Sequence, residues 1–111
     1  MQIYFKNKKL QKICSVDGEA KKVIGKNAEK KLKQRLAELK AADVLSDISH
    51  LPPARLHELT GNRSGIFSVD LEHPYRLLFM AANDPVPLKE DGGIDKRSVT
   101  EVEIVEIADT H

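Results

Sequence analysis

The sequence has no tryptophan, only one cysteine and no long run of apolar residues. Cys14 has no second cysteine with which to form an internal disulfide or a zinc site, so we interpret it as a half-buried small side chain. No segment approaches the roughly 20 apolar residues that span a bilayer, and the start MQIYFKNKKL lacks the apolar core of a signal peptide. These absences predict a cytoplasmic protein that makes no contact with a membrane.

Charge is distributed unevenly along the chain. The 111 residues suffice for one domain with a modest core, so we expect a single domain over residues 1–111. Residues 1–40 carry twelve Lys or Arg against four Asp or Glu, whereas residues 41–111 carry six against thirteen. A basic first third is typical of a protein that meets a polyanion with one surface. A solvated, lysine-rich helix face explains the same pattern equally well.

The first half of the chain predicts one short strand followed by helices. Residues 2–6 alternate as a strand does, Asn7 can cap a short helix, and Asp17 can cap another that Gly25 ends. The longest helix opens at Asn27. Its apolar face comprises Ala28, Leu32, Leu36 and Leu39, and its remaining circumference carries Lys30, Lys31, Lys33 and Arg35.

After Pro52 and Pro53 the apolar period changes from helical to alternating. We expect strands over residues 55–60, 66–72, 75–80 and 99–108, with an irregular segment before the last one. The alternation slips between Ile104 and Val105, which indicates a bulge or a strand buried on both faces. The predicted fold is α+β, with the amino-terminal strand and the helices packed on one face of an antiparallel sheet. We expect its core to unite Leu32, Leu36, Leu39, Phe67, Val69, Leu77 and Phe79.

The stretch LHELTGNRSGIFSVDLEHPYRLLF places cations among strand residues. Arg76 lies in a mostly apolar strand, so its guanidinium needs a partner, either a phosphate or Asp70 or Glu103 in a structural ion pair. The glycines around Asn62-Arg63-Ser64 would present Arg63 to a phosphate, although a solvated loop tip explains it too. We interpret His50 as a helix cap and His73 as a structural residue in a turn.

This stretch, with a closing strand that ends in VEIVEIADTH, resembles the RelE/ParE superfamily of bacterial toxins, and its HigB-like branch in particular. The most specific parts of the resemblance, which covers essentially the whole chain, are Leu59, Gly61, Arg63 and Gly65, the segment Tyr75-Arg76-Leu77, and Asp109-Thr110-His111. The resemblance implies a toxin that cuts messenger RNA on the ribosome and needs no cofactor. It also implies a cognate helix-turn-helix antitoxin, similar to HigA, through which alone the toxin would contact operator DNA.

By position, the resemblance assigns catalytic roles to His57, Arg76, Asp109 and His111. Because RNA carries its own nucleophile, the 2′-hydroxyl, a metal-independent ribonuclease needs groups that transfer protons and cations that stabilise phosphate charge, and histidine and arginine suit these roles. We expect the RNA-binding residues to be Thr60, Asn62, Arg63, Lys30, Lys31 and Lys33.

Two positions depart from the family pattern. Thr60 replaces a lysine that many HigB-like toxins carry before the first turn glycine, and Thr110 replaces a tyrosine before the last histidine. Neither threonine can supply the missing cation or the stacking ring. These losses favour an alternative function, a catalytically weak module that binds the antitoxin and modulates repression of the operon. A ParE-like inhibitor of DNA gyrase is a further alternative, whereas retention of His57, Arg76 and His111 favours the nuclease.

Overall fold

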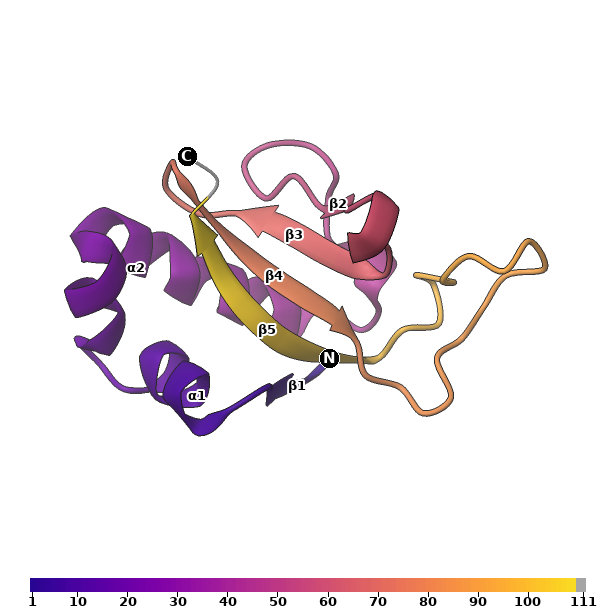
Figure 1. Cartoon of the computed structure of the whole chain (residues 1–111), viewed down its shortest axis with the longest axis horizontal. Coiled ribbons are helices and arrows are strands. Elements are labelled where there is room, and N and C mark those ends of the chain that lie inside the picture. The colour runs from indigo at the N-terminus through magenta and orange to yellow at the C-terminus, as the bar shows by residue number, and fades with distance from the viewer. Residues whose placement is uncertain (110–111) are drawn as a thin grey trace.

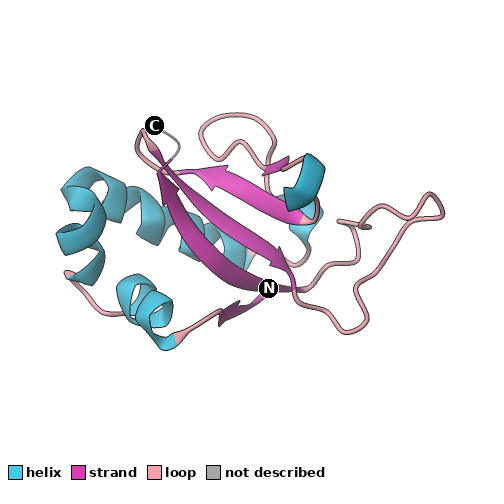
Figure 2. Cartoon of the chain, viewed as in Figure 1, coloured by secondary structure: helices cyan, strands magenta, loops and turns pink. Residues whose placement is uncertain are grey.

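Five strands form one sheet, and two helices cover one of its faces (Figures 1 and 2). The computed structural model describes residues 1–109. In chain order its elements are β1 (Gln2–Phe5), α1 (Lys8–Ser15), α2 (Glu19–Ala41), η1 (Leu45–Asp47), β2 (His57–Glu58), η2 (Gly61–Arg63), β3 (Ile66–Asp70), β4 (Tyr75–Ala81) and β5 (Glu101–Asp109), where η marks a 3-10 turn. The predicted α+β class is therefore confirmed. Strand β2, the first after the prolines, is shorter than the strand expected over residues 55–60.

The strand order is β1-β5-β4-β3-β2. Strands β2 to β5 pair antiparallel with their neighbours, as expected, but β1 pairs with β5 in parallel. Parallel neighbours require a long crossover connection, and here the chain between β1 and β5 includes both helices. The sheet is thus mixed rather than wholly antiparallel.

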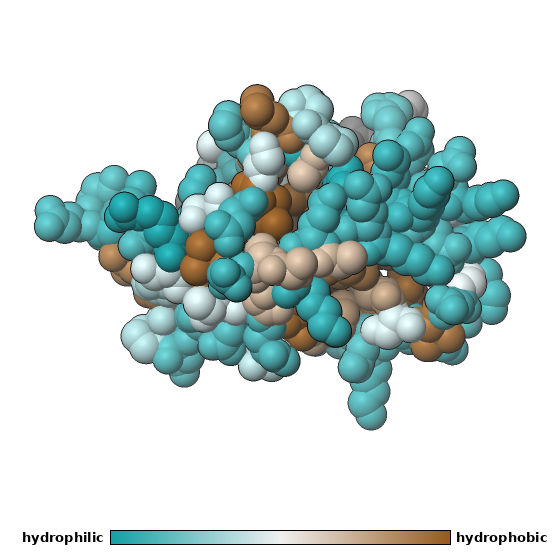
Figure 3. Space-filling view, turned by 180° about the vertical axis from the view of Figure 1, so that it is seen from behind, coloured by the Kyte–Doolittle hydropathy of each residue, from teal (hydrophilic) through white to brown (hydrophobic). Residues whose placement is uncertain are grey.

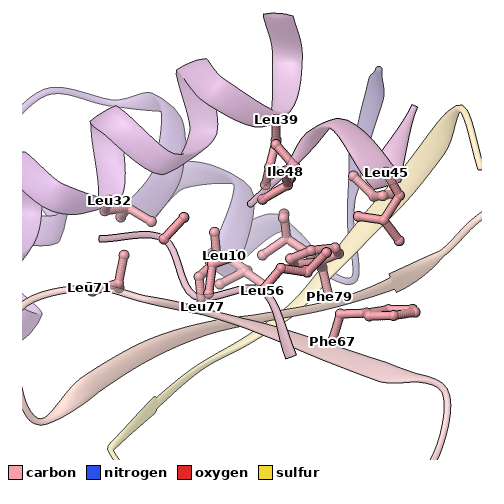
Figure 4. Close-up of a cluster of buried hydrophobic side chains, with 14 of the residues drawn as sticks. Leu10, Leu32, Leu39, Leu45, Ile48, Leu56, Phe67, Leu71, Leu77 and Phe79 are labelled. Atoms are coloured by element: carbon pink, nitrogen blue, oxygen red, sulfur yellow. The ribbon is translucent and has the colours of Figure 1, made fainter. Parts of the chain in front are cut away.

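The core lies between the helices and the sheet (Figure 4). Leu32 and Leu39 of α2 face Leu77 and Phe79 of β4, and all four are at most 1% exposed. The rings of Phe67 and Phe79 stack with their centroids 5.9 Å apart. The predicted core is confirmed, except that Leu36 is only half-buried at its margin.

Arg35 occupies the position in the core that Leu36 was expected to take. It is 2% exposed, and its Nε donates to the main-chain oxygen of Asp70 at 2.8 Å, while its Nη1 contacts the carboxylate of Glu38 at 3.2 Å. The buried stripe of α2 runs through residues 28, 32, 35 and 39, with alternating spacings of four and three. Our placement of Arg35 on the exposed circumference was wrong because its hydrogen bonds satisfy the guanidinium inside the protein.

The helix boundaries follow capping chemistry only in part. Asn7 caps α1 as predicted, its Oδ1 accepting from Leu10 N at 2.8 Å. Gly18, with a φ of 85°, precedes α2 instead of Asp17, whose carboxylate contacts Lys33 Nζ at 3.2 Å. At Gly25 the backbone leaves helical geometry (φ 86°, ψ 169°), so the expected helix end is a kink within α2.

The expected irregularity in the last strand is a β-bulge. Leu78 pairs with Glu106 and Phe79 with Ile104, so Val105 has no counterpart on β4. The segment between β4 and β5 extends away from the sheet as an arm (Figure 1) and contains one isolated bridge, Leu88 with Ile94. Within residues 1–109, no helix combines the length and apolar character needed to cross a membrane.

Cys14 is half-buried, as we interpreted it. Burial raises the pKa of its thiol to about 11. The neutral thiol therefore dominates near neutral pH, which makes Cys14 a poor nucleophile.

Replacement of Leu32 by Ala should lower the free energy of unfolding by about 2–5 kcal/mol, because it leaves a cavity in a fully packed region. Leu36→Ala removes the same atoms from the half-buried margin and should cost clearly less. Chemical denaturation of both variants measures the difference. Equal losses would show that α2 packs with a different face against the sheet.

Candidate functional site

The face of the sheet opposite the helices carries the cations that the sequence singles out. Leu77 and Phe79 point into the core, so Arg76, between Tyr75 and Leu77, points to the other face. Arg76 pairs in register with Asp70, and His57 pairs with Ser68. Since residues 68 and 70 share one face of β3, His57 and Arg76 lie on the same face of the sheet, opposite the helices.

His57 and Arg76 line one groove of about 680 Å³, together with His50, Pro52, Arg55 and Leu56. A second hollow of about 300 Å³ is lined by Arg55, Asp70, Leu71, His73, Pro74, Tyr75 and Arg76. Arg55 and Arg76 belong to both linings, so the two hollows adjoin along these arginines. Two predicted catalytic residues therefore share one surface depression.

Asp70 lies between the two arginines. Its Oδ2 is 3.0 Å from Arg55 Nε, and its Oδ1 is 3.6 Å from Arg76 Nε. The ion pair with Asp70 that we weighed for Arg76 is thus present. Arg76 nevertheless keeps 33% of its side chain exposed, so it remains accessible to an anion.

Arg55 is the site residue that sequence reasoning missed. Among the non-glycine residues of the described chain it is the one with a positive φ, 52°. Its N–H donates to Leu51 O at 3.0 Å, and on the two sides of Arg55 the Leu56 N–H donates to Ser49 O and the Asp70 N–H to Ala54 O. Its only sequence signal was an arginine at the first position of a predicted strand, which does not reveal this backbone conformation or its partner.

The turn that carries the predicted RNA-binding residues is exposed. Thr60, Asn62 and Arg63 are all exposed, and Arg63 Nη2 contacts Glu106 Oε1 on β5 at 3.0 Å. Gly65 N donates to Glu58 Oε2 at 3.2 Å, which closes the loop at its base. Arg63 therefore crosses from this loop to β5 in an ion pair between two half-exposed side chains.

The carboxyl-terminal residues are placed only in part. Asp109 ends β5 opposite Tyr75, and the preceding Ala108 pairs with Arg76. Asp109 is thus one residue beyond the register position of Arg76 on the neighbouring strand. The predicted catalytic His111, and Thr110 before it, lie outside the described residues.

The three predicted lysines lie away from the groove. Lys30, Lys31 and Lys33 belong to α2, which packs against the opposite face of the sheet. Figure 3 views the molecule from this side and shows hydrophilic side chains gathered over the helices. Lys33 contacts Asp17, and Lys31 is half-buried. The structure does not bring these lysines together with His57 and Arg76.

A comparison with protein families identifies a match over most of the chain. The family model of the RelE-like toxin of the type II toxin-antitoxin system HigB matches residues 3–88. This range includes β1 from its second residue, β2 to β4, the groove residues His57 and Arg76, and Asp70. A search of curated proteins gave no match.

Proposed function

Because this chain belongs to the HigB-like family of RelE-like toxins of type II toxin-antitoxin systems, we propose that it is a ribosome-dependent endoribonuclease that inhibits translation by cutting messenger RNA. The observation that carries the proposal is that His57 and Arg76, which are separated in sequence, line the same groove. RNA cleavage through the 2′-hydroxyl requires proton transfer and stabilisation of phosphate charge, and an imidazole and a guanidinium suit these two tasks.

The proposed reaction uses the substrate's own nucleophile. The 2′-oxygen attacks the adjacent phosphorus, the bond from phosphorus to the 5′-oxygen breaks, and a proton passes from the 2′-hydroxyl to the leaving oxygen through the protein's acid and base groups. Arg76 stabilises the extra negative charge on the phosphate, because a guanidinium fork matches two phosphate oxygens. The products are a 2′,3′-cyclic phosphate and a 5′-hydroxyl, without a metal ion or a cofactor.

Proton transfer needs one group that accepts and one that donates. His57 is exposed in the groove and fills one of these roles. We propose His111 for the other role, with Asp109 orienting it. The end of β5 supports this choice, since Asp109 follows directly after the residue that pairs with Arg76.

A type II toxin implies an antitoxin as partner. We propose a helix-turn-helix antitoxin of the HigA kind, with operator DNA contacted only through it, and a site of action on cytoplasmic ribosomes. The turn residues Thr60, Asn62 and Arg63 would contact the RNA beside the groove. Their exposure on the loop between β2 and β3 supports this role.

One observation favours a second candidate, the catalytically weak antitoxin-binding module. The pairing of Arg76 with Asp70 lowers the positive charge that the groove offers to a phosphate. Inhibition of gyrase would differ from both, because replication rather than translation would stop first after expression of the protein.

Arg76→Ala should lower the rate of messenger RNA cleavage by roughly 10² to 10³, the loss expected for one preorganised group that stabilises charge. His57→Ala should lower it by about 10² to 10⁴ through loss of proton transfer. Arg97→Ala serves as control, because Arg97 is 82% exposed on the arm between β4 and β5. The assay is cleavage by purified protein on programmed ribosomes; parent-like rates in both groove variants would refute the proposed chemistry.

Charge reversal at Lys30, Lys31 and Lys33 tests the proposed contact of α2 with RNA. The triple variant should bind ribosomes less tightly and with a shallower dependence on salt, because it releases fewer counterions. Reversal of Lys8, Lys9 and Lys12 on α1 changes the net charge equally and is the matched control. A salt slope equal to that of the parent would assign the lysines of α2 to a solvated face.

A further inference from the structure

Asp70 joins two arginines that come from different parts of the chain. Arg55 precedes β2, and Arg76 is the second residue of β4. Their Nε atoms lie 3.0 Å and 3.6 Å from the two different carboxylate oxygens of Asp70. One carboxylate therefore contacts two neighbouring guanidinium groups.

Both guanidiniums remain available to a further anion. The side chain of Arg55 is 51% exposed and that of Arg76 is 33% exposed. A guanidinium has five N–H donors, so a contact through Nε leaves donors for a second partner. The three charges of Arg55, Asp70 and Arg76 sum to one positive charge, at the boundary between the two hollows.

The position of Arg55 is fixed from both sides. Its backbone has the left-handed φ of 52°, which is unfavourable for a residue with a side chain and persists only where the surroundings enforce it. The main-chain hydrogen bond from Arg55 N to Leu51 O closes the segment on itself, and the one from Asp70 N to Ala54 O holds it against the end of β3. Residues held in such conformations cluster at active sites and ligand-binding sites.

We propose that Arg55 binds the RNA phosphate backbone together with Arg76, and that Asp70 is the positioning residue for both. This inference rests on the proposed function and extends its groove to a pair of arginines. Arg55 then supplies a second cation beside the scissile phosphate. The cation absent at Thr60 is thereby replaced from a different segment of the chain.

Asp70 could instead only compete with RNA for the arginines, and the two roles predict opposite effects of its removal. If Asp70 competes, loss of its negative charge should leave cleavage unchanged or accelerate it. If Asp70 positions the arginines, its loss should slow the chemical step, because a misplaced charge-stabilising group loses most of its benefit. The sign of the change therefore decides between them.

The role of Arg55 is tested by the salt dependence of binding to a single-stranded RNA oligonucleotide, followed by fluorescence anisotropy. Arg55→Ala should reduce the slope of log K against log salt by about 0.7, the value for one phosphate contact on single-stranded RNA. Arg97→Ala removes another exposed arginine that is paired with an aspartate, 3.5 Å from Asp95, and should leave the slope unchanged. A parent-like slope for Arg55→Ala would overturn its role in phosphate binding.

The role of Asp70 is tested with Asp70→Asn, which keeps the main-chain oxygen that accepts from Arg35. In the ribosome assay its kcat should fall roughly 10- to 100-fold, with a smaller change in KM, since placement rather than folding is affected. Asp95→Asn on the arm is the matched control, and thermal melts check that both variants fold. A kcat equal to or above that of the parent would overturn the positioning role.

Failure of the inference and failure of the proposed function give different results. If the parent cuts messenger RNA, Arg76→Ala does not, and Asp70→Asn does so normally, only the positioning role is wrong. If the parent itself does not cut, the proposed function and the role of Asp70 fail together. The salt slope still decides whether Arg55 binds phosphate, because that measurement needs no cleavage.

Discussion

The junction at Asp70 connects the helix layer, the sheet and the groove. The buried guanidinium of Arg35 in α2 donates to the main-chain oxygen of Asp70, and the Asp70 carboxylate contacts Arg55 and Arg76 on the opposite face of the sheet. A buried cation is tolerated only when its donors are satisfied, so Arg35 constrains how α2 can pack against β3. The same residue, Asp70, thereby links the packing of the core to the geometry of the candidate site.

One face of the sheet packs in the core and the other carries the candidate site, because side chains alternate along each strand. Leu77 and Phe79 contribute to the core, and Arg76 between Tyr75 and Leu77 contributes to the groove. The bulge at Val105 changes this alternation in β5, so that Ile104 and Ile107 both pack toward the core while Glu106 meets Arg63. The extra residue in β5 thus allows Ile104 and Ile107 to pack into the core while Glu106 lies on the opposite face.

Periodicity predicted most of the fold, because Leu32, Leu39, Phe67 and Phe79 are buried wherever the helix and strand periods place them. Periodicity did not reveal that Arg35 is buried more deeply than Leu36, because a charged residue is predicted to be exposed until its tertiary partners are known. The parallel pairing of β1 with β5 could not be predicted either, because pairing between segments far apart in the chain leaves no local sequence pattern. For the candidate site, the family resemblance singled out His57 and Arg76, which line one groove, whereas the place of Arg55 beside them depends on a backbone conformation and on Asp70.

We propose that the groove on this face of the sheet cuts RNA through the substrate's own 2′-hydroxyl. The chemistry of the fragment ends tests it most directly: messenger RNA cut by the purified parent on ribosomes is mapped for the group at each new 5′ end. We predict 5′-hydroxyl ends, each matched by a 2′,3′-cyclic or 3′-phosphate on the upstream fragment. Fragments with 5′-phosphate ends would contradict it, because water rather than the 2′-oxygen would then have attacked the phosphorus.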